Sequence, residues 1–214
     1  PIVEARVKSQ INFKKSADTM RELPVQLGRY LSPQIVQSII AGKSEAKIST
    51  KRKKLTVFFS DLAGFTSTSE SMEPEDLTFC INTYLDRMAE AAIDFGGTLD
   101  KFMGDGIMIF FGDPETKGVK DDALACIAMA KRMQEVVVEL RDIFAAQGID
   151  KDLHARIGIH TGYCNVGNFG SERRMDYTLL GRSVNLASRL ESNGAVDKIH
   201  VSAETYSLIK NDYD

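Results

Sequence analysis

Two aspartates stand at the ends of apolar runs in the first half of the chain. Asp61 follows KLTVFFS, and Asp105 lies between TLDKFM and IMIFF, each with glycine close by. A single aspartate at a strand end is usually a turn cap, but two on neighbouring strands would give a divalent cation hard oxygen ligands. Such ligands favour Mg²⁺ or Mn²⁺, which binds through one or two carboxylates and substrate phosphates. Backbone N–H groups of Gly64, Phe65 and Thr66 could then face a phosphate chain.

A second candidate group lies near the other end of the sequence, in RSVNLASRLE. Asn185 and Arg189 are four residues apart, so on a helix they project from the same face and could hold one anionic or polar group together. Taken alone, the pair is more typical of a routine polar contact on an exposed helix face.

Hydrophobic periodicity predicts the elements that would position these side chains. Strands are expected at residues 54–60, 98–103, 107–111, 153–159, around 162–166 and at 199–201, and helices at 32–42, 74–95, 121–146, 183–191 and 203–210. A short glycine-containing loop at 104–106 predicts a hairpin. Residues 167–181 are polar and interrupted by glycine. The order strand, helix, hairpin, helix, strand predicts an α+β fold with a ferredoxin-like, palm-like βαββαβ sheet and covering helices.

Residues 1–50 are expected to form a helical connector or signalling arm, and residues 51–214 one compact domain. In the arm, Phe13, Ala17, Met20, Leu27 and Leu31 follow the four-three spacing of a two-helix seam. Pro24 would interrupt a continuous helix, and packing of one helix on its own domain explains the spacing equally well. The basic run at 51–54 is interpreted as a solvated linker. Because the sequence begins with proline rather than methionine, we expect an upstream sensor or membrane domain.

Composition narrows the function classes. A net charge of -3 and a pI near 5.7 argue against a general nucleic-acid binder. Three widely spaced cysteines without a CxxC pair predict neither a disulfide framework nor a thiolate metal site, and they favour a reducing compartment. No run approaches the roughly 20 apolar residues of a membrane span. We therefore expect a cytoplasmic domain, and membrane anchoring of the full-length protein stays open.

Four ordered motifs carry a resemblance to a known family. FSDLAGFT, DKFMGDGIMIFFG, RIGIHTG and YTLLGRSVNLASRLE, in that order and at these separations, resemble the catalytic domain of class III nucleotidyl cyclases over about residues 53–210. LGRYL followed by SPQIVQSII is similar to the connector that often precedes this domain in bacterial cyclases. The family usually continues past the last helix into a hairpin bearing a phosphate-binding lysine, which this sequence does not contain.

The resemblance implies an adenylate cyclase that makes 3′,5′-cyclic AMP and pyrophosphate from ATP. It implies that Asp61 and Asp105, with the backbone carbonyl of Leu62, bind two Mg²⁺ ions, which Mn²⁺ can replace. Asn185 matches the asparagine that orients the ribose. Arg189 matches the arginine that stabilises charge at the α-phosphate during in-line attack by the 3′-hydroxyl.

Base choice, on the same resemblance, rests on two positions. Lys101 matches the lysine that accompanies adenine, where guanylyl cyclases typically carry glutamate. Thr178, seven residues before Asn185, matches the threonine of a bacterial and soluble-cyclase-like subgroup, which is also associated with bicarbonate stimulation. Asp176 stands nine residues before Asn185 and is interpreted as structural.

The family also implies a symmetric homodimer. The metal aspartates come from one subunit, while the purine pair and the Asn/Arg pair come from the other. A guanylate cyclase and a catalytically silent, dimerising nucleotide-binding module are the alternatives. The GG[DE]EF signature of a diguanylate cyclase is absent. His154 and His160 are interpreted as structural, and Arg173 or Arg174 is a weaker candidate for phosphate contact.

Overall fold

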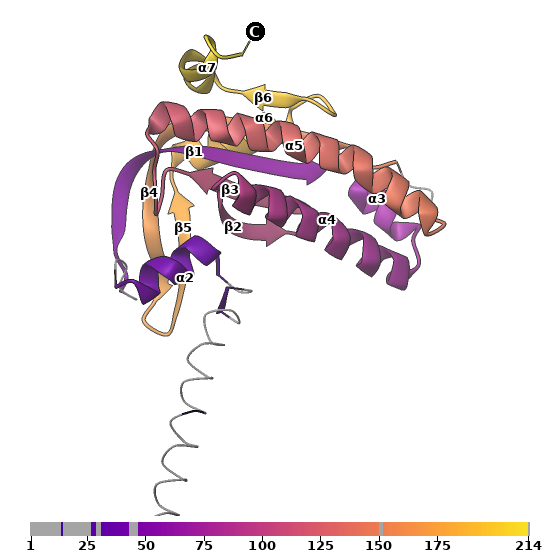
Figure 1. Cartoon of the computed structure of the whole chain (residues 1–214), viewed down its shortest axis with the longest axis horizontal. Helices are drawn as coiled ribbons and strands as arrows, with labels where there is room; N and C mark the ends of the chain where they lie inside the picture. Colours follow the sequence, from indigo (N-terminus) through magenta and orange to yellow (C-terminus); the bar gives the residue numbers. More distant parts are fainter. Residues whose placement is uncertain (1–13, 15–26, 29–30, 43–46, 150–151, 214) are drawn as a thin grey trace, which may run out of the picture. The chain divides into compact units, whose positions relative to one another are not determined.

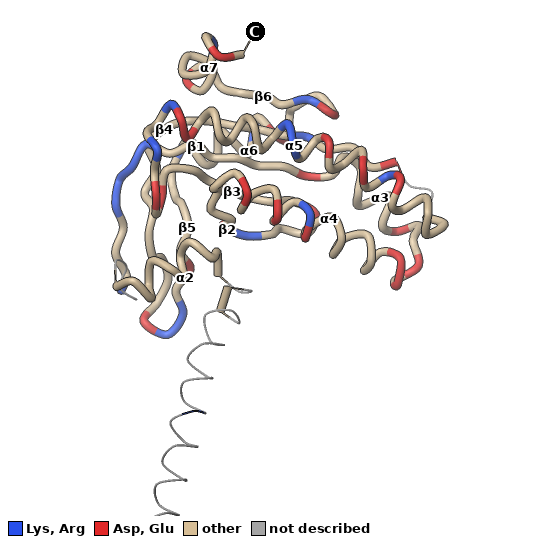
Figure 2. The backbone as a smooth tube through the Cα atoms, viewed as in Figure 1, with Lys and Arg blue, Asp and Glu red and all other residues tan. Residues whose placement is uncertain are grey.

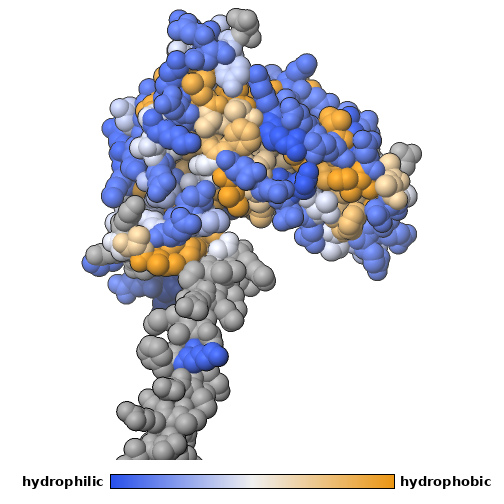
Figure 3. All heavy atoms as spheres, viewed as in Figure 1, coloured by the Kyte–Doolittle hydropathy of each residue, from blue (hydrophilic) through white to orange (hydrophobic). Residues whose placement is uncertain are grey.

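The computed structural model describes residues 14, 27–28, 31–42, 47–149 and 152–213. The chain divides into two compact units, residues 1–46 and 47–214, which are described separately. Most of the predicted two-helix seam lies outside the described residues. In the first unit, α2 (Pro33–Ile40) forms as predicted, with a proline in its first turn. Ile39 and Ile40 at its end are exposed, and Figure 3 shows hydrophobic surface over this helix.

The second unit contains the predicted order of strand, helix, hairpin, helix and strand (Figure 1). It differs from the prediction by one additional short helix and one additional strand, and the strands expected at 153–159 and around 162–166 form a single continuous strand. Its elements are β1 (Thr50–Leu62), α3 (Phe65–Glu70), α4 (Pro74–Asp94), β2 (Thr98–Met103), β3 (Gly106–Phe111), α5 (Val119–Ala146), β4 (Ala155–Ser171), β5 (Arg174–Leu180), α6 (Arg182–Ser192), β6 (Ile199–Val201) and α7 (Ala203–Ile209). None of the helices in the described ranges is both long and apolar enough to cross a membrane.

The sheet has the strand order β2-β3-β1-β4-β5, with every neighbouring pair antiparallel, and β6 pairs in parallel with β4. The first four strands therefore have the order of a ferredoxin-like sheet, and the predicted α+β fold is confirmed. The hairpin around residues 104–106 is also confirmed, since β2 and β3 pair up to Met103 and Gly106.

Two strands are longer than the sequence predicted. The ladder between β1 and β4 is continuous from Thr50 opposite Gly167 to Leu62 opposite Ala155. The basic run at 51–54 therefore belongs to β1 (Figure 2), and its interpretation as a linker was wrong. The charged side chains give no strand pattern, but pairing with β4 satisfies the backbone hydrogen bonds of this segment and so extends the strand.

The segment 167–181 is also more regular than its polar, glycine-rich sequence suggested. It forms the end of β4 and the whole of β5, paired from Asn165 opposite Leu180 to Ser171 opposite Arg174. The hydrophobic pattern missed this hairpin because only Thr178 and Leu179 among the side chains of residues 167–181 are buried, so backbone pairing rather than burial specifies it.

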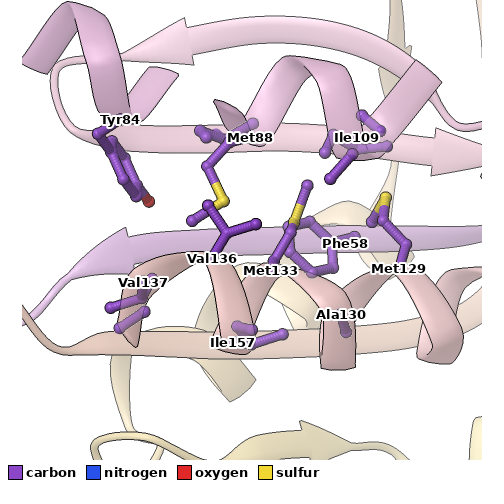
Figure 4. Packing of buried hydrophobic residues seen from close by; sticks show 14 of the residues in the cluster. Phe58, Tyr84, Met88, Ile109, Met129, Ala130, Met133, Val136, Val137 and Ile157 are labelled. Atoms are coloured by element: carbon purple, nitrogen blue, oxygen red, sulfur yellow. The ribbon is translucent and has the colours of Figure 1, made fainter. Parts of the chain in front are cut away.

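Both faces of the central strands are covered. On one face, α4 and α5 pack over Phe58, Ile109 and Ile157, and Figure 4 shows Met88 of α4 close to Met133 and Val136 of α5. On the other face, the core comprises Leu55, Val57, Phe59, Met108, Phe110, Cys164, Val166, Leu179 and Ala187, the last two contributed by β5 and α6. Burial on both faces explains why β3 and residues 55–59 of β1 do not alternate between apolar and charged side chains.

Candidate active site

The two predicted metal aspartates lie at the same end of the sheet. β1 pairs with β3 up to Ser60 opposite Ile107, so the end of β1 lies beside the turn that joins β2 to β3. The backbone N–H of Leu62 donates a hydrogen bond to Asp105 Oδ2 over 3.0 Å. This contact holds the Asp105 carboxylate next to the residue that follows Asp61, although 43 residues separate the two bonded groups in sequence.

An arginine that the sequence analysis did not select faces Asp61 across the β1–β4 ladder. Arg156 Nε donates to Asp61 Oδ1 over 3.0 Å and Nη2 donates to Oδ2 over 2.5 Å. This is the fork geometry of a bidentate ion pair. The sequence predicted only a strand at 153–159, and the register of β1 with β4 shows that Arg156 faces an aspartate.

Glu191 of α6 lies behind this ion pair. Its side chain is buried, and its Oε1 is 3.7 Å from Arg156 Nε. Burial, followed by the neighbouring Asp61 carboxylate, raises the pKa of Glu191 to about 7. Near neutral pH, this group can therefore be protonated, which limits the negative charge beside Asp61.

The donor set suits a hard cation with few protein ligands. Within the part of the chain that the structure describes, no group of three or more His, Cys, Asp or Glu side chains could hold a metal ion. Asp61 and Asp105 offer carboxylate oxygens only, which fits Mg²⁺ that keeps water or phosphate oxygens as its other ligands. A cation bound here would compete with Arg156 for the oxygens of Asp61.

The predicted phosphate segment forms the start of the short helix α3. Gly64 precedes it with φ of 73°, a left-handed conformation that a residue with Cβ adopts with strain. Thr68 N–H donates back to Gly64 O over 3.1 Å, so the N–H groups before it have no acceptor within the helix. The partly buried Phe65 side chain packs on the core, leaving Thr66 at the surface.

Lys101 and Thr178, the predicted purine pair, meet at a third residue. Thr178 Oγ1 donates to Asp100 Oδ2 over 2.6 Å, and Lys101 Nζ is 3.3 Å from Asp100 Oδ1. These residues come from β2 and β5, which are the two ends of the strand order. Figure 1 shows that β1 is bent, and the Asp100–Thr178 bond links the two end strands of this curved sheet. Local sequence patterns carry no signal for the Asp100–Thr178 contact because it spans 78 residues.

Asn185 and Arg189 lie on α6, four residues apart and both exposed. Within the described residues, neither side chain forms a hydrogen bond or an ion pair, with Asp61, with Asp105 or with any other residue. The helix begins at Arg182, one residue before the predicted start at Ser183. Ser183 instead donates its hydroxyl to Tyr163 O over 3.0 Å, because the bond that ties α6 to β4 replaces a capping bond.

The remaining candidates lie elsewhere. Asp176 is exposed on β5, and Arg173 and Arg174 are exposed at the β4–β5 turn. His160 is buried, with Nδ1 2.8 Å from Ser202 Oγ, and His154 Nδ1 lies 2.6 Å from Asp197 Oδ2. Within the described residues, none of these side chains forms a hydrogen bond or ion pair with the predicted metal aspartates or with the predicted purine pair.

Comparisons with known proteins identify related sequences and structures. Residues 48–214 match the family model described as the adenylate and guanylate cyclase catalytic domain. The chain is 35% identical over 187 residues to an adenylate cyclase of Anabaena cylindrica, covering 85% of this chain and 35% of that protein. The chain thus spans about a third or less of the length of the curated relatives it matches.

Two solved structures are similar over most of the chain. The adenylyl cyclase CyaB from P. aeruginosa has 56% identity and a TM-score of 0.75, covering 77% of this chain and 84% of that one. The guanylyl cyclase Cya2 has 40% identity and a TM-score of 0.71, covering 75% of this chain and 80% of that one. The chain belongs to the family of adenylate and guanylate cyclase catalytic domains.

Proposed function

We propose that the protein is an adenylate cyclase that converts ATP to 3′,5′-cyclic AMP and pyrophosphate. The observation that carries the proposal is the contact of Asp105 with the end of β1, which gathers two carboxylates from separate segments in a domain of this family. In the reaction, the ribose 3′-hydroxyl loses its proton to solvent and its oxygen bonds to the α-phosphorus. The bond from that phosphorus to the oxygen bridging it to the β-phosphate breaks, and pyrophosphate leaves.

Asp61, Asp105 and the carbonyl of Leu62 are the proposed ligands of two Mg²⁺ ions, which Mn²⁺ can replace. When bound, such ions lower the pKa of the 3′-hydroxyl and neutralise triphosphate charge. The N–H groups of residues 64–66 are proposed to contact phosphate oxygens.

Asn185 is proposed to orient the ribose. Arg189 is proposed to donate to the α-phosphate, where negative charge develops. Removing one such donor costs on the order of 3 kcal/mol of transition-state stabilisation, or about 10²-fold in rate. Both side chains are exposed and have no partner within the described residues, so they are available to a substrate.

The proposed base is adenine. Its N1 accepts a hydrogen bond and its amino group donates one, which suits the Lys101 ammonium as donor and the Thr178 hydroxyl as acceptor. Guanine presents the opposite pattern at these two positions. The higher identity to the adenylyl cyclase CyaB than to the guanylyl cyclase Cya2 also supports adenine, and Cya2 keeps guanylate cyclase as the second candidate.

We also propose that the active site is shared between two subunits of a homodimer. Within the described residues, Asn185 and Arg189 form no hydrogen bond or ion pair with the proposed metal aspartates, so a second copy would complete the site. Phe102 and Met103, on the hairpin that bears Asp105, are 42% and 46% exposed, which suits an interface between copies.

The regulation of the domain is proposed to come from outside it. The arm at residues 1–50 would connect an upstream sensor or membrane domain, as the greater length of the relatives suggests. A cytoplasmic location for the catalytic domain follows from its proposed substrate and from its three free cysteines.

Production of cyclic nucleotide from ATP and from GTP, with Mg²⁺ or Mn²⁺, tests the activity. We expect product from ATP, loss of that product in Asp105→Ala, and retention in the matched control Asp176→Ala. If the folded protein binds nucleotide but forms no product, the enzyme proposal is refuted and the protein is a catalytically silent binding module. Product from GTP alone would favour the guanylate cyclase.

Mixing two inactive variants tests the shared site. Asp61→Ala and Arg189→Ala subunits combine to give one intact site in each mixed dimer, so we expect about a quarter of the wild-type activity from a random mixture. Activity no higher than that of either variant alone would refute the shared site.

A further inference from the structure

We propose that Asp100 is a positioning residue that selects the purine base by fixing the direction of the Thr178 hydroxyl. This inference rests on the proposed function, because it assigns a role to a residue behind the proposed adenine site. Asp100 itself is withdrawn from substrate, since 1% of its side chain is exposed, compared with 44% for Lys101. It can therefore act on the base only through the side chains that it contacts.

A β-bulge places Asp100 in this position. Leu99 pairs with Ile109 and Lys101 pairs with Met108, so Asp100 is the extra residue between two consecutive pairs. In a regular strand, Asp100 and Lys101 would point to opposite faces. The bulge removes this alternation, and both side chains reach the same place, as the 3.3 Å contact between them shows.

The hydrogen-bond partners of Asp100 determine which way the hydroxyl points. The Lys101 ammonium can only donate, and an ionised carboxylate can only accept, so the Thr178 hydroxyl must give its hydrogen to Asp100. The oxygen of Thr178 then keeps only lone pairs for any other partner. Burial raises the pKa of Asp100 above its ordinary value, and the bond from Thr178 and the charge of Lys101 offset this rise only in part.

This fixed direction distinguishes the two purines. A hydroxyl whose hydrogen is already used can accept from the adenine amino group, but it has nothing to donate to the guanine carbonyl oxygen. Such a site rejects guanine because both the hydroxyl oxygen of the protein and the carbonyl oxygen of the base would lack a hydrogen-bond donor. Thr178 without Asp100 could rotate and serve either base. The specificity thus belongs to the pair rather than to the threonine alone.

Asp100→Asn tests the inference with almost no change of shape. The Lys101 ammonium still requires an acceptor, which keeps the amide oxygen on its side and turns the amide NH₂ toward Thr178. Thr178 then accepts that bond, and its hydrogen is released toward the base. We expect the ratio of kcat/KM for ATP to kcat/KM for GTP to fall about tenfold, as befits one hydrogen bond.

Three further variants separate a positioning role from a structural one. Asp176→Asn, the same chemical change on the exposed part of β5, should leave the ratio unchanged. Thr178→Ser keeps the hydroxyl and should keep most of the preference. In a Thr178→Val background, Asp100→Asn should no longer move the ratio. Equal losses for ATP and GTP in Asp100→Asn, or a ratio that still moves in that background, would overturn the proposal.

A binding measurement keeps the inference separate from the proposed activity. Dissociation constants for ATP and GTP, measured by calorimetry on the same variants, report base preference without turnover. If the wild type forms no product, but the ratio of its dissociation constants for ATP and GTP differs about tenfold from that of Asp100→Asn, the positioning role stands and the proposed activity fails. If product forms and neither ratio moves, the positioning role fails and the activity stands.

Discussion

Gly158→Ala should displace the helix that carries Asn185 and Arg189. Gly158 lies in β4 directly beneath α6. A Cβ at this position would lie 2.2 Å from the backbone N of Glu191 and 2.4 Å from the backbone O of Ala187. The backbone of Gly158 does not require a glycine conformation, since its φ lies outside the left-handed region. The substitution therefore tests the close approach of α6 alone.

The size of the effect follows from these distances. The 2.2 Å separation is 1.2 Å shorter than the 3.4 Å at which ordinary van der Waals contact begins, and the atoms met are backbone, which cannot rotate away. α6 must then move by about 1 Å. Overpacking of this kind typically costs about 1–3 kcal/mol of unfolding free energy. A 1 Å misplacement of catalytic groups can lower the rate by about 10²-fold.

Urea denaturation and cyclase activity measure the two effects together. For a slope of roughly 2 kcal/mol per molar, a 2 kcal/mol loss moves the midpoint by about 1 M. Gly106→Ala is the matched control for stability, because its Cβ would come no nearer than 3.2 Å, to Met103 O. Its midpoint should fall by clearly less.

A methyl group at position 158 that cost nothing would contradict the packing argument. If Gly158→Ala had the midpoint and activity of the wild type, α6 could not lie as close to β4 as the distances require. If it lost stability but kept full activity, the placement of Asn185 and Arg189 would not depend on this contact.

Two further predictions concern buried titrating groups. Burial lowers the pKa of His160, and the Glu204 carboxylate 3.8 Å from Nδ1 offsets this only in part. The native state thus binds fewer protons than the unfolded state below pH 6.5, and the unfolding free energy falls as pH drops from there through the folded pKa. NMR titration of the three histidines should give a pKa for His160 below 6.5, and a value at or above 6.5 would contradict the prediction. Burial also raises the pKa of Cys80, Cys126 and, to about 11, Cys164. Native protein should therefore react with a thiol reagent much more slowly than urea-unfolded protein, and fast native labelling would show that one of the three is accessible.

Local patterns in the sequence determined most of the architecture. The apolar run in β1, the 3.6-residue periodicity of α4 and α5 and the glycine loop at 104–106 each reflect interactions between residues close in sequence or a burial pattern that repeats. The same patterns failed for residues 167–181, where an exposed hairpin is held by backbone pairing, and for residues 51–54, where a charged segment extends a paired strand.

The sequence alone also identified the residue types of the site, through Asp61, Asp105, Lys101, Thr178, Asn185 and Arg189. Their roles stay predictions until they are tested. Only the tertiary structure decided what surrounds them. Arg156 faces Asp61 because of the register between β1 and β4, and Asp100 meets Thr178 because a bulge and a curved sheet join its two end strands. Such contacts depend on the summed geometry of the intervening strands, which no local pattern encodes.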